Sequence, residues 1–311
     1  MKFYDLLPLV TIMAVQMWLG DALPVTDDLF PDIADTSHAT QLAAEFFHGY
    51  FTAKSLHNAT LWLEFFHPTQ VVYYDATLGE GFSSRSQLVT AFTEFTEEWP
   101  KNAISYPLQI LGDTDSAVIH YVNTPGLFGT AEIRSISAVD FRDGKVTRQV
   151  DYWDGRRNPD DTASPNDPYP YSLGVETVEQ KAAPEMNRTA HQLNAALAAN
   201  DADAAAALFS YDAIWIDLTL RTRQEGQPAI SRYLQRALVN LPFGPGTNLR
   251  HVLGTAQGGG YEWQAAGNGT LNGITALELD KGSFTQLITS WDGSRVSDTA
   301  LQALVALSFE A

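Results

Sequence analysis

The chain has no cysteine among its 311 residues. This absence excludes a disulfide framework, a thiolate nucleophile, an iron–sulfur cluster and a zinc site with thiolate ligands. Basic residues are scarce, since 19 Lys and Arg stand against 37 Asp and Glu and give a formal net charge of −18. A surface this acidic repels phosphate backbones, so we expect no binding of nucleic acid.

Motifs for metals, phosphates and serine nucleophiles are also missing. The seven histidines show no His-x-x-x-His or His-Glu-x-x-His spacing, and there is no Gly-x-Ser-x-Gly elbow. No predicted strand-to-helix transition surrounds the run Gly258–Gly260, which therefore indicates a turn and not a phosphate loop. We expect neither a metal ion nor a cofactor.

Residues 1–22 have the layout of a secretory signal peptide. The apolar run Leu6–Leu19 precedes Gly20 and Ala22, which place small residues at −3 and −1 of a cut after Ala22. The run is short for a membrane span, and the alternative is an uncleaved anchor or a buried N-terminal helix. Behind the cut we expect an acidic N-terminal arm over residues 23–37.

Acceptor tripeptides for N-glycosylation fit the same secretory route. They begin at Asn58, Asn187 and Asn268. Together with the leader they predict a glycoprotein that is secreted or stays in the lumen of the secretory pathway. Beyond the leader no apolar stretch approaches the ~20 residues of a membrane span, so we expect no span after its removal.

The chain repeats itself. The segment Ser137–Gly155 matches Thr275–Gly293 without gaps, and both end in Trp-Asp-Gly. Earlier in each half, the short strand pattern Val72–Leu78 matches Ile214–Leu220, and each precedes a helical pattern. The order of elements is the same in both halves, which predicts two copies of one domain.

Between the copies lies a linker rich in proline and aspartate over residues 158–175, whose prolines preclude a continuous helix. Domain 1 is therefore predicted over residues 38–157 and domain 2 over residues 176–311. Periodicity predicts the helices 38–54, 58–66 and 84–99 in domain 1 and strands over residues 71–78, 104–111, 116–123, 131–141 and 146–153.

Three helices followed by a curved antiparallel sheet make an α+β cone in each copy, with a pocket between the helices and the sheet. In copy two, Leu208–Asp217 has the pattern Leu-Phe-x-x-Asp-Ala-x-x-x-Asp and follows the helix ending Leu193–Asp203. These segments resemble the NTF2-like superfamily, which includes ketosteroid isomerases and SnoaL-like proteins. The resemblance covers nearly all of residues 38–157 and 176–300, and this fold hosts enzymes, binders and scaffolds alike.

The resemblance implies catalytic roles for particular positions. An Asp that ends the first strand is the proton-shuttling base in isomerase members, and Asp75 and Asp217 stand there. The family's oxyanion-binding Tyr on the first helix corresponds to Tyr50 in copy one and to Leu193 in copy two. For the family's second acid, on a late strand, Asp140 is the nearest candidate.

The residues themselves add further candidates. Asp151 and Trp153 share one face of the last predicted strand of copy one, because strand side chains alternate. Asp151 corresponds to Thr289 in copy two, so the carboxylate is unique to copy one and is a pocket candidate. Trp153 recurs as Trp291, which also fits a core residue. His120, in the middle of a strand, is a candidate acid, base or donor, or a structural histidine.

Four residues complete the candidate set as substrate-binding side chains: Tyr73, Trp153, Asp217 and His67. Tyr73 precedes the candidate base Asp75 by two residues, and His67 lies close to it in sequence. For His67 the alternative is a cap at a helix end, and for Asp217 it is an ion pair with nearby arginines. The catalytic candidates are Asp75, Tyr50, Asp151 and His120.

SnoaL-like and ketosteroid-isomerase-like proteins imply cofactor-independent general acid/base catalysis. The resemblance includes fungal cyclases that dimerise maleic-anhydride units. We therefore expect an enzyme of secondary metabolism that isomerises, cyclises or couples a polyketide-like substrate through an enolate. Copy two would be a structural partner, and a homodimer would fit the family. The alternatives are a secreted, non-enzymatic binder of a small hydrophobic ligand and a scaffold with filled interiors.

Overall fold

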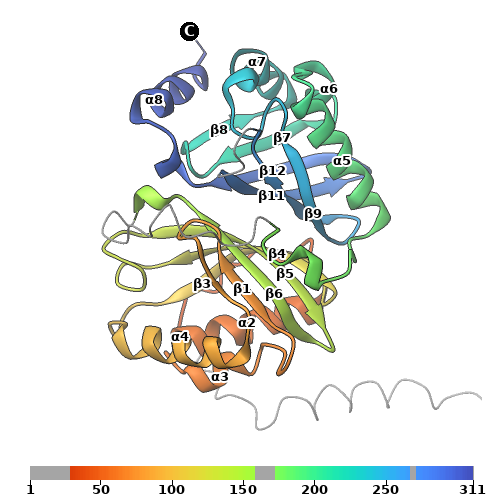
Figure 1. Ribbon diagram of the computed structural model, residues 1–311. Helices are drawn as coiled ribbons and strands as arrows, with labels where there is room; N and C mark the ends of the chain where they lie inside the picture. Colours follow the sequence, from red (N-terminus) through yellow and green to blue (C-terminus); the bar gives the residue numbers. More distant parts are fainter. Residues whose placement is uncertain (1–28, 158–171, 267–270, 311) are drawn as a thin grey trace, which may run out of the picture.

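The computed structural model describes residues 29–157, 172–266 and 271–310 (Figure 1). The predicted signal peptide, most of the linker and the tripeptide at Asn268 lie outside the described residues. Within them, no helix has the length and apolar character of a membrane span. The described part of the acidic arm is largely exposed, and Asp35 forms an isolated parallel bridge with Gln109 at the sheet edge of domain 1.

Domain 1 has the predicted order of helices and strands, with one further short strand at Glu80–Phe82 that the sequence does not predict. Its helices begin where a polar side chain accepts a hydrogen bond from the first turn: Thr40 before α2, Asn58 before α3 and Ser84 before α4. The helices are α2 (Gln41–Ser55), α3 (Ala59–Leu63) and α4 (Arg85–Glu98). The strands are β1 (Val72–Asp75), β2 (Glu80–Phe82), β3 (Ser105–Gly112), β4 (Ser116–Asn123), β5 (Ile133–Arg142) and β6 (Lys145–Trp153).

Domain 2 repeats this plan and adds a C-terminal helix that the repeat does not predict. Its helices are α5 (Pro184–Ala198), α6 (Ala202–Ala206), α7 (Gln227–Ala237) and α8 (Asp298–Leu307). Its strands are β7 (Phe209–Asp217), β8 (Thr222–Glu225), β9 (Asn248–Gly254), β10 (Gly258–Gln264), β11 (Asn272–Asp280) and β12 (Ser283–Trp291). The added α8 buries Leu301 and Leu304 against the domain 2 core. Short 3-10 turns follow both Trp-Asp motifs, at Gly155–Arg157 and Gly293–Arg295.

Each domain has a six-stranded sheet, in the order β2-β1-β6-β5-β4-β3 in domain 1 and β8-β7-β12-β11-β10-β9 in domain 2. The prediction of a wholly antiparallel sheet is wrong at one place in each, because β1 pairs parallel with β6 and β7 parallel with β12. Hairpin turns impose antiparallel pairing only on consecutive strands, and β1 meets β6 only after the chain has passed through α4 and four other strands. The two α+β domains, each with helices packed on one face of a six-stranded sheet, are otherwise as expected.

The two sheets pack face to face (Figure 1). Each domain covers one face of its sheet with its own helices and turns the other face toward the second domain. A separate apolar cluster fills the space between them, with Tyr74, Val118 and Tyr152 of domain 1 against Leu253 and Ile274 of domain 2. The second copy therefore acts as a partner within the same chain.

A buried ion network crosses this interface. The guanidinium of Arg148 is fully buried, and it binds Glu262 of domain 2 at 2.7 Å and Asp140 of domain 1 at 3.1 Å. His251 Nε2 lies 2.8 Å from the other oxygen of Asp140, and the Tyr152 hydroxyl donates to Glu262 at 2.6 Å. Buried charges of this kind are stable only when every partner is present.

Candidate functional site

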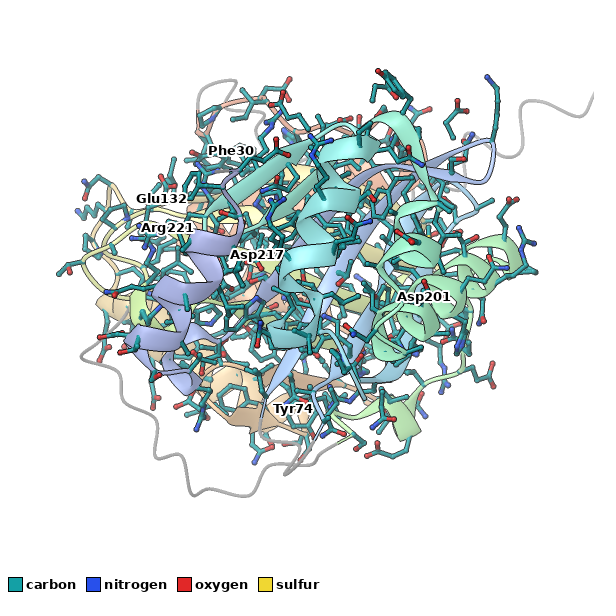
Figure 2. The ribbon with its side chains drawn as sticks, turned by 90° about the horizontal axis from the view of Figure 1, so that it is seen from above. Phe30, Tyr74, Glu132, Asp201, Asp217 and Arg221 are labelled. Carbon is teal, nitrogen blue, oxygen red and sulfur yellow. The ribbon has the colours of Figure 1, made fainter. Side chains whose placement is uncertain are left out.

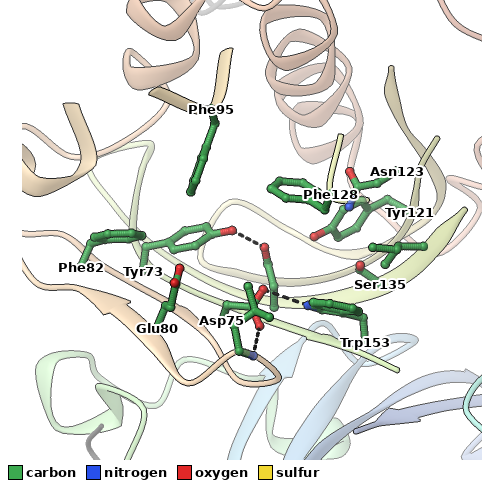
Figure 3. A pocket seen from close by; sticks show the side chains of 13 residues that line it. Tyr73, Asp75, Glu80, Phe82, Phe95, Tyr121, Asn123, Phe128, Ser135 and Trp153 are labelled. Carbon is green, nitrogen blue, oxygen red and sulfur yellow. Dashed lines mark hydrogen bonds between the residues drawn. The ribbon is translucent and has the colours of Figure 1, made fainter. Parts of the chain in front are cut away.

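Domain 1 contains a cavity of about 110 Å³ between its sheet and its helices (Figure 3). Most of its wall is aromatic or aliphatic, with carboxylates and a few polar groups at separate points. The lining residues are Tyr73, Asp75, Leu78, Glu80, Phe82, Phe95, Tyr121, Asn123, Phe128, Ile133, Ser135, Asp151 and Trp153. A concave, mainly apolar site with a few convergent polar groups is typical of a small-molecule site.

Asp75 ends β1 and reaches the cavity from its rim. Its Oδ1 accepts from the backbone N–H groups of Thr77 at 2.9 Å and Leu78 at 2.8 Å, and its Oδ2 accepts from Trp153 Nε1 at 2.9 Å. Burial raises the pKa of Asp75 to about 7, against the opposing effect of these three hydrogen bonds. A half-buried carboxyl with this pKa can both take up and release a proton near neutral pH.

Asp151 is the second carboxylate in the cavity wall, and it is held by three donors. The Tyr73 hydroxyl donates to it at 2.5 Å, Ser137 Oγ at 2.5 Å and Gln149 Nε2 at 2.9 Å. Burial, together with the nearby charge of Asp151, raises the pKa of Tyr73 well above its ordinary value. Asp151 is therefore fixed in place and has most of its acceptor capacity occupied.

Four of the predicted residues come together here. Asp75, Asp151, Tyr73 and Trp153 all line the same cavity, and Figure 3 shows the Tyr73 and Trp153 hydrogen bonds to the two carboxylates. Trp153 joins Asp151 on one face of β6, as strand alternation predicts, and it is at once a core residue and a hydrogen-bond donor to the candidate base.

Tyr50 is connected to Asp151 only through an intervening side chain, that of Gln149. Its hydroxyl is buried in the helix layer and donates to Gln149 Oε1 at 3.1 Å, and the amide of Gln149 in turn donates to Asp151. Tyr50 is absent from the cavity lining, so it reaches the site only through Gln149. Burial raises the pKa of Tyr50 far above its ordinary value.

The prediction that His120 faces the pocket is wrong. Its neighbours on β4, Tyr121 and Asn123, line the cavity, so strand alternation turns His120 toward the opposite face with Val118, which packs against domain 2. Its Nε2 is buried and has no hydrogen-bond partner in the described part of the chain. Burial lowers the pKa of His120 to about 4.

His67 and Asp217 also lie away from the cavity. His67 Nδ1 accepts from the backbone N–H groups of Thr69 at 3.3 Å and Gln70 at 3.0 Å, so His67 stabilises the turn after α3. Asp217 belongs to domain 2, where it accepts from Leu220 N and Trp291 Nε1 and is fully buried. Asp217 is buried in the interior of domain 2, whereas Arg221 is exposed (Figure 2).

Of the two candidate carboxylates Asp140 and Asp151, it is Asp151 that reaches the cavity of domain 1. Asp151 lines the cavity, whereas Asp140 faces domain 2 and binds Arg148 and His251. Val139, the residue before Asp140 on β5, is a buried core residue. Asp151, on the neighbouring strand β6, brings a carboxylate to the cavity instead.

Sequence reasoning missed two polar residues at the opposite end of the site, Lys54 and Asn123. Lys54 is 3% exposed, and its Nζ donates to Asn123 Oδ1 at 3.1 Å. A signal for it was present in the sequence. Lys54 follows Phe47, Tyr50 and Phe51 by seven, four and three residues, so it shares the apolar face of its helix. A lysine on such a face either is buried with partners for its ammonium group or extends out of the core into solvent.

No protein-family model and no curated protein matches the chain significantly. Among solved structures it is similar to a steroid Δ-isomerase from Pseudomonas aeruginosa, at 18% identity over 42% of this chain and 93% of that one, with a TM-score of 0.33. A SnoaL-like protein from Burkholderia thailandensis is similar at 17% identity over 37% and 98% of the chains, with a TM-score of 0.32. An NTF2-like protein from Burkholderia xenovorans is similar at 20% identity over 35% and 83%, with a TM-score of 0.29.

Proposed function

We propose that the domain 1 cavity is the active site of a cofactor-independent enzyme that removes a proton from the carbon beside a carbonyl group. The product of that step is an enolate, which is the common intermediate of isomerisation, cyclisation and carbon–carbon coupling of polyketide-like substrates. The resemblance to ketosteroid isomerases and SnoaL-like proteins suggested this chemistry, and the cavity of domain 1 supplies groups suited to it.

The observation that carries the proposal is the burial of Asp75 beside a cavity. Asp75 lines a largely aromatic cavity, and burial raises the pKa of its carboxyl to about 7. As a carboxylate it takes the proton from the substrate carbon, and as a carboxylic acid it returns that proton to another carbon of the enolate. Three donors hold the group, so the base is oriented before the substrate binds.

The aromatic wall supports the same step. Phe82, Phe95 and Phe128 give the cavity wall apolar surface, which suits a small hydrophobic substrate and limits the access of water. The nearby carboxylate of Asp151, which is held in place by its donors, also helps to raise the pKa of Asp75.

We also propose that the protein enters the secretory pathway and carries sugar at Asn58. Asn58 is exposed at the start of α3, and its Thr60 is exposed as well. Asn187 lies inside helix α5, and its Thr189 is 2% exposed, so this second tripeptide is a poor acceptor. These placements favour a single glycan on the part of the chain that the structure describes.

Proton exchange on a small ketone tests the proposed reaction. We expect the full chain in heavy water to exchange the C2 protons of 3-cyclohexen-1-one and to isomerise it to the conjugated ketone, followed by proton NMR and ultraviolet absorption. Asp75→Asn should lower both rates by about 10²-fold or more, because it removes the base. Asp217→Asn is the matched control in domain 2 and should leave them unchanged.

Two outcomes would contradict this assignment. Equal rates for the wild-type chain and Asp75→Asn would show that Asp75 is not the base. Saturable binding of the ketone without any exchange above the buffer rate would favour the alternative, a non-enzymatic binder of small hydrophobic ligands. Thermal unfolding of each variant checks that the fold is intact.

A further inference from the structure

We infer that the end of the cavity formed by Asn123 is a binding site for a carbonyl oxygen and for the enolate oxygen derived from it, with Lys54 as the positioning residue behind it. The inference deepens the proposed function and rests on it for the reaction, but the binding site can be tested without turnover. Asn123 would touch the substrate oxygen, and Lys54 would act through Asn123.

Lys54 occupies an unusual position for a lysine. Its Nζ lies 5.0 Å from the ring centre of Tyr121, 5.4 Å from that of Trp62, 5.5 Å from that of Phe128 and 6.0 Å from that of Phe51. The faces of these rings stabilise a cation and exclude water. No carboxylate lies within ion-pair distance of this ammonium in the described residues.

The ammonium fixes the orientation of the Asn123 side chain. An ammonium group can only donate hydrogen bonds, so the group that faces it must be the amide oxygen. Ser105 Oγ donates to the same oxygen at 2.8 Å. The amide nitrogen of Asn123 therefore points away from both donors.

The amide nitrogen is then available to the cavity. Asn123 belongs to the cavity wall, and Figure 3 shows its amide beside the ring of Tyr121. In the described part of the chain no group accepts a hydrogen bond from this nitrogen. An amide N–H whose oxygen binds a cation is a stronger donor than a free amide, because the two dipoles align.

The charge of Lys54 suits the charge that develops during the reaction. Burial lowers the pKa of Lys54 to about 8, and the charges of Asp151 and Asp75 oppose this effect. When Asp75 takes up a proton, its negative charge passes to the substrate oxygen. A buried cation and a pre-oriented donor stabilise that oxygen without rearrangement of solvent.

Domain 2 shows that the fold does not require this pair. By the spacing that relates Tyr50 to Leu193, Lys54 corresponds to the buried Leu197. Strands β4 and β10 are related through their pairing with Ser137 of β5 and Thr275 of β11, so Asn123 corresponds to Ala265. The pair is thus an addition of domain 1 to a shared framework.

Binding of 4-nitrophenol tests the site directly. Its phenolate carries a delocalised oxyanion on a six-membered ring, and its absorption spectrum reports whether the bound form is ionised. The Asp75→Asn chain is the reference, because a neutral side chain there imitates Asp75 after it has taken up the proton. We expect it to bind the phenolate and to lower the pKa of the bound phenol by at least about one unit.

The two variants for comparison carry the residues that domain 2 has at the corresponding positions. Lys54→Leu and Asn123→Ala, each combined with Asp75→Asn, should abolish the pKa shift and weaken phenolate binding by about tenfold or more, while neutral phenol binds as before. A loss of packing alone would weaken both forms equally. Thermal unfolding should show both variants folded, since Leu and Ala already occupy these positions in domain 2.

The result that overturns the inference is a phenol pKa shift that persists in both variants, or no binding of 4-nitrophenol to the Asp75→Asn chain. Neither result depends on catalysis. The proposed function fails separately, when Asp75→Asn leaves ketone exchange unchanged, so the two failures are distinguishable.

Discussion

The two domains share one framework around one aspartate. In domain 1, Asp75 accepts from Trp153 Nε1 at 2.9 Å, and in domain 2, Asp217 accepts from Trp291 Nε1 at 3.2 Å. Each carboxylate also accepts from the backbone N–H three residues later, at Leu78 or Leu220. The Asp–Trp pair is therefore part of the fold, since it ties the turn after the first strand to the last strand of the sheet.

The interiors around this framework differ. Gln149 and Asp151 of domain 1 correspond to Leu287 and Thr289 of domain 2, and Tyr50 corresponds to Leu193. Burial raises the pKa of Asp217 to about 6, close to the value of about 7 for Asp75. A raised pKa thus accompanies the framework itself. What distinguishes domain 1 is a set of polar side chains near the aspartate, of which Asp151 and Asn123 line its cavity.

The largest effect on stability should come from the interface between the domains, where the buried Arg148 of domain 1 binds Glu262 of domain 2. Arg148→Met leaves Glu262 and Asp140 buried without their shared cation, so we expect a loss of about 3–5 kcal/mol in the free energy of unfolding. Urea unfolding followed by circular dichroism measures it.

The control for this substitution is Gln286→Met, at the corresponding position of domain 2. It should change the free energy of unfolding by less than about 0.5 kcal/mol, because Gln286 is half-buried and outside the ion network. Similar losses for both variants would mean that the Arg148 network adds nothing beyond packing at the interface.

The pH dependence of exchange should separate the two aspartates. The active form of a base is the carboxylate, and burial places the pKa of Asp75 at about 7. Exchange of 3-cyclohexen-1-one should therefore fall about tenfold for each pH unit below 7 and level off above it. Rate measurements between pH 4 and pH 9 on the wild-type chain and on Asp217→Asn should give the same curve.

A curve with its midpoint near 4 would indicate a base with an ordinary carboxyl pKa and would contradict the role given to Asp75. A change of midpoint in Asp217→Asn would show that domain 2 takes part in the reaction, contrary to the contrast drawn between the domains.

The sequence could reveal the framework because the repeat and the strand ending in Asp75 or Asp217 are local patterns. The alternation along the last strand also placed Asp151 and Trp153 together correctly. His120 was misjudged because alternation groups residues on one face without showing which face is inward. Helical spacing places Lys54 on the apolar face of its helix, but no local pattern shows that its ammonium lies among rings from three other segments, at Trp62, Tyr121 and Phe128.

Lys54→Leu should make the protein more stable, since it gives domain 1 the residue that domain 2 has there. The fold lowers the pKa of Lys54 from 10.5 to about 8, so the charged form costs stability below pH 8. We expect a gain of about 2–3 kcal/mol at pH 7. Because lysine becomes neutral in both folded and unfolded chains above pH 10.5, the part of the gain that comes from the buried charge should be lost there.

Thermal and urea unfolding at pH 7 and at pH 11 measure this gain. Leu197→Met, a change of similar volume in domain 2, is the control and should have the same effect at both pH values. An unchanged or lower stability of Lys54→Leu at pH 7 would mean that the aromatic rings and Asn123 offset or outweigh the cost of burying the charge.

The smallest effect concerns the surface, where the two domains also differ. After expression in a secretory host, Asn58→Gln should remove one glycan from the mass of the protein, because Asn58 and Thr60 are exposed. Asn187→Gln should leave the mass of the glycans unchanged, because Thr189 is buried within α5. Mass spectrometry before and after enzymatic removal of glycans measures both. A glycan at Asn187 would overturn the distinction between the two tripeptides. Asn58→Gln also loses the cap on Leu61 N, which should lower the free energy of unfolding by about 0.5–1 kcal/mol.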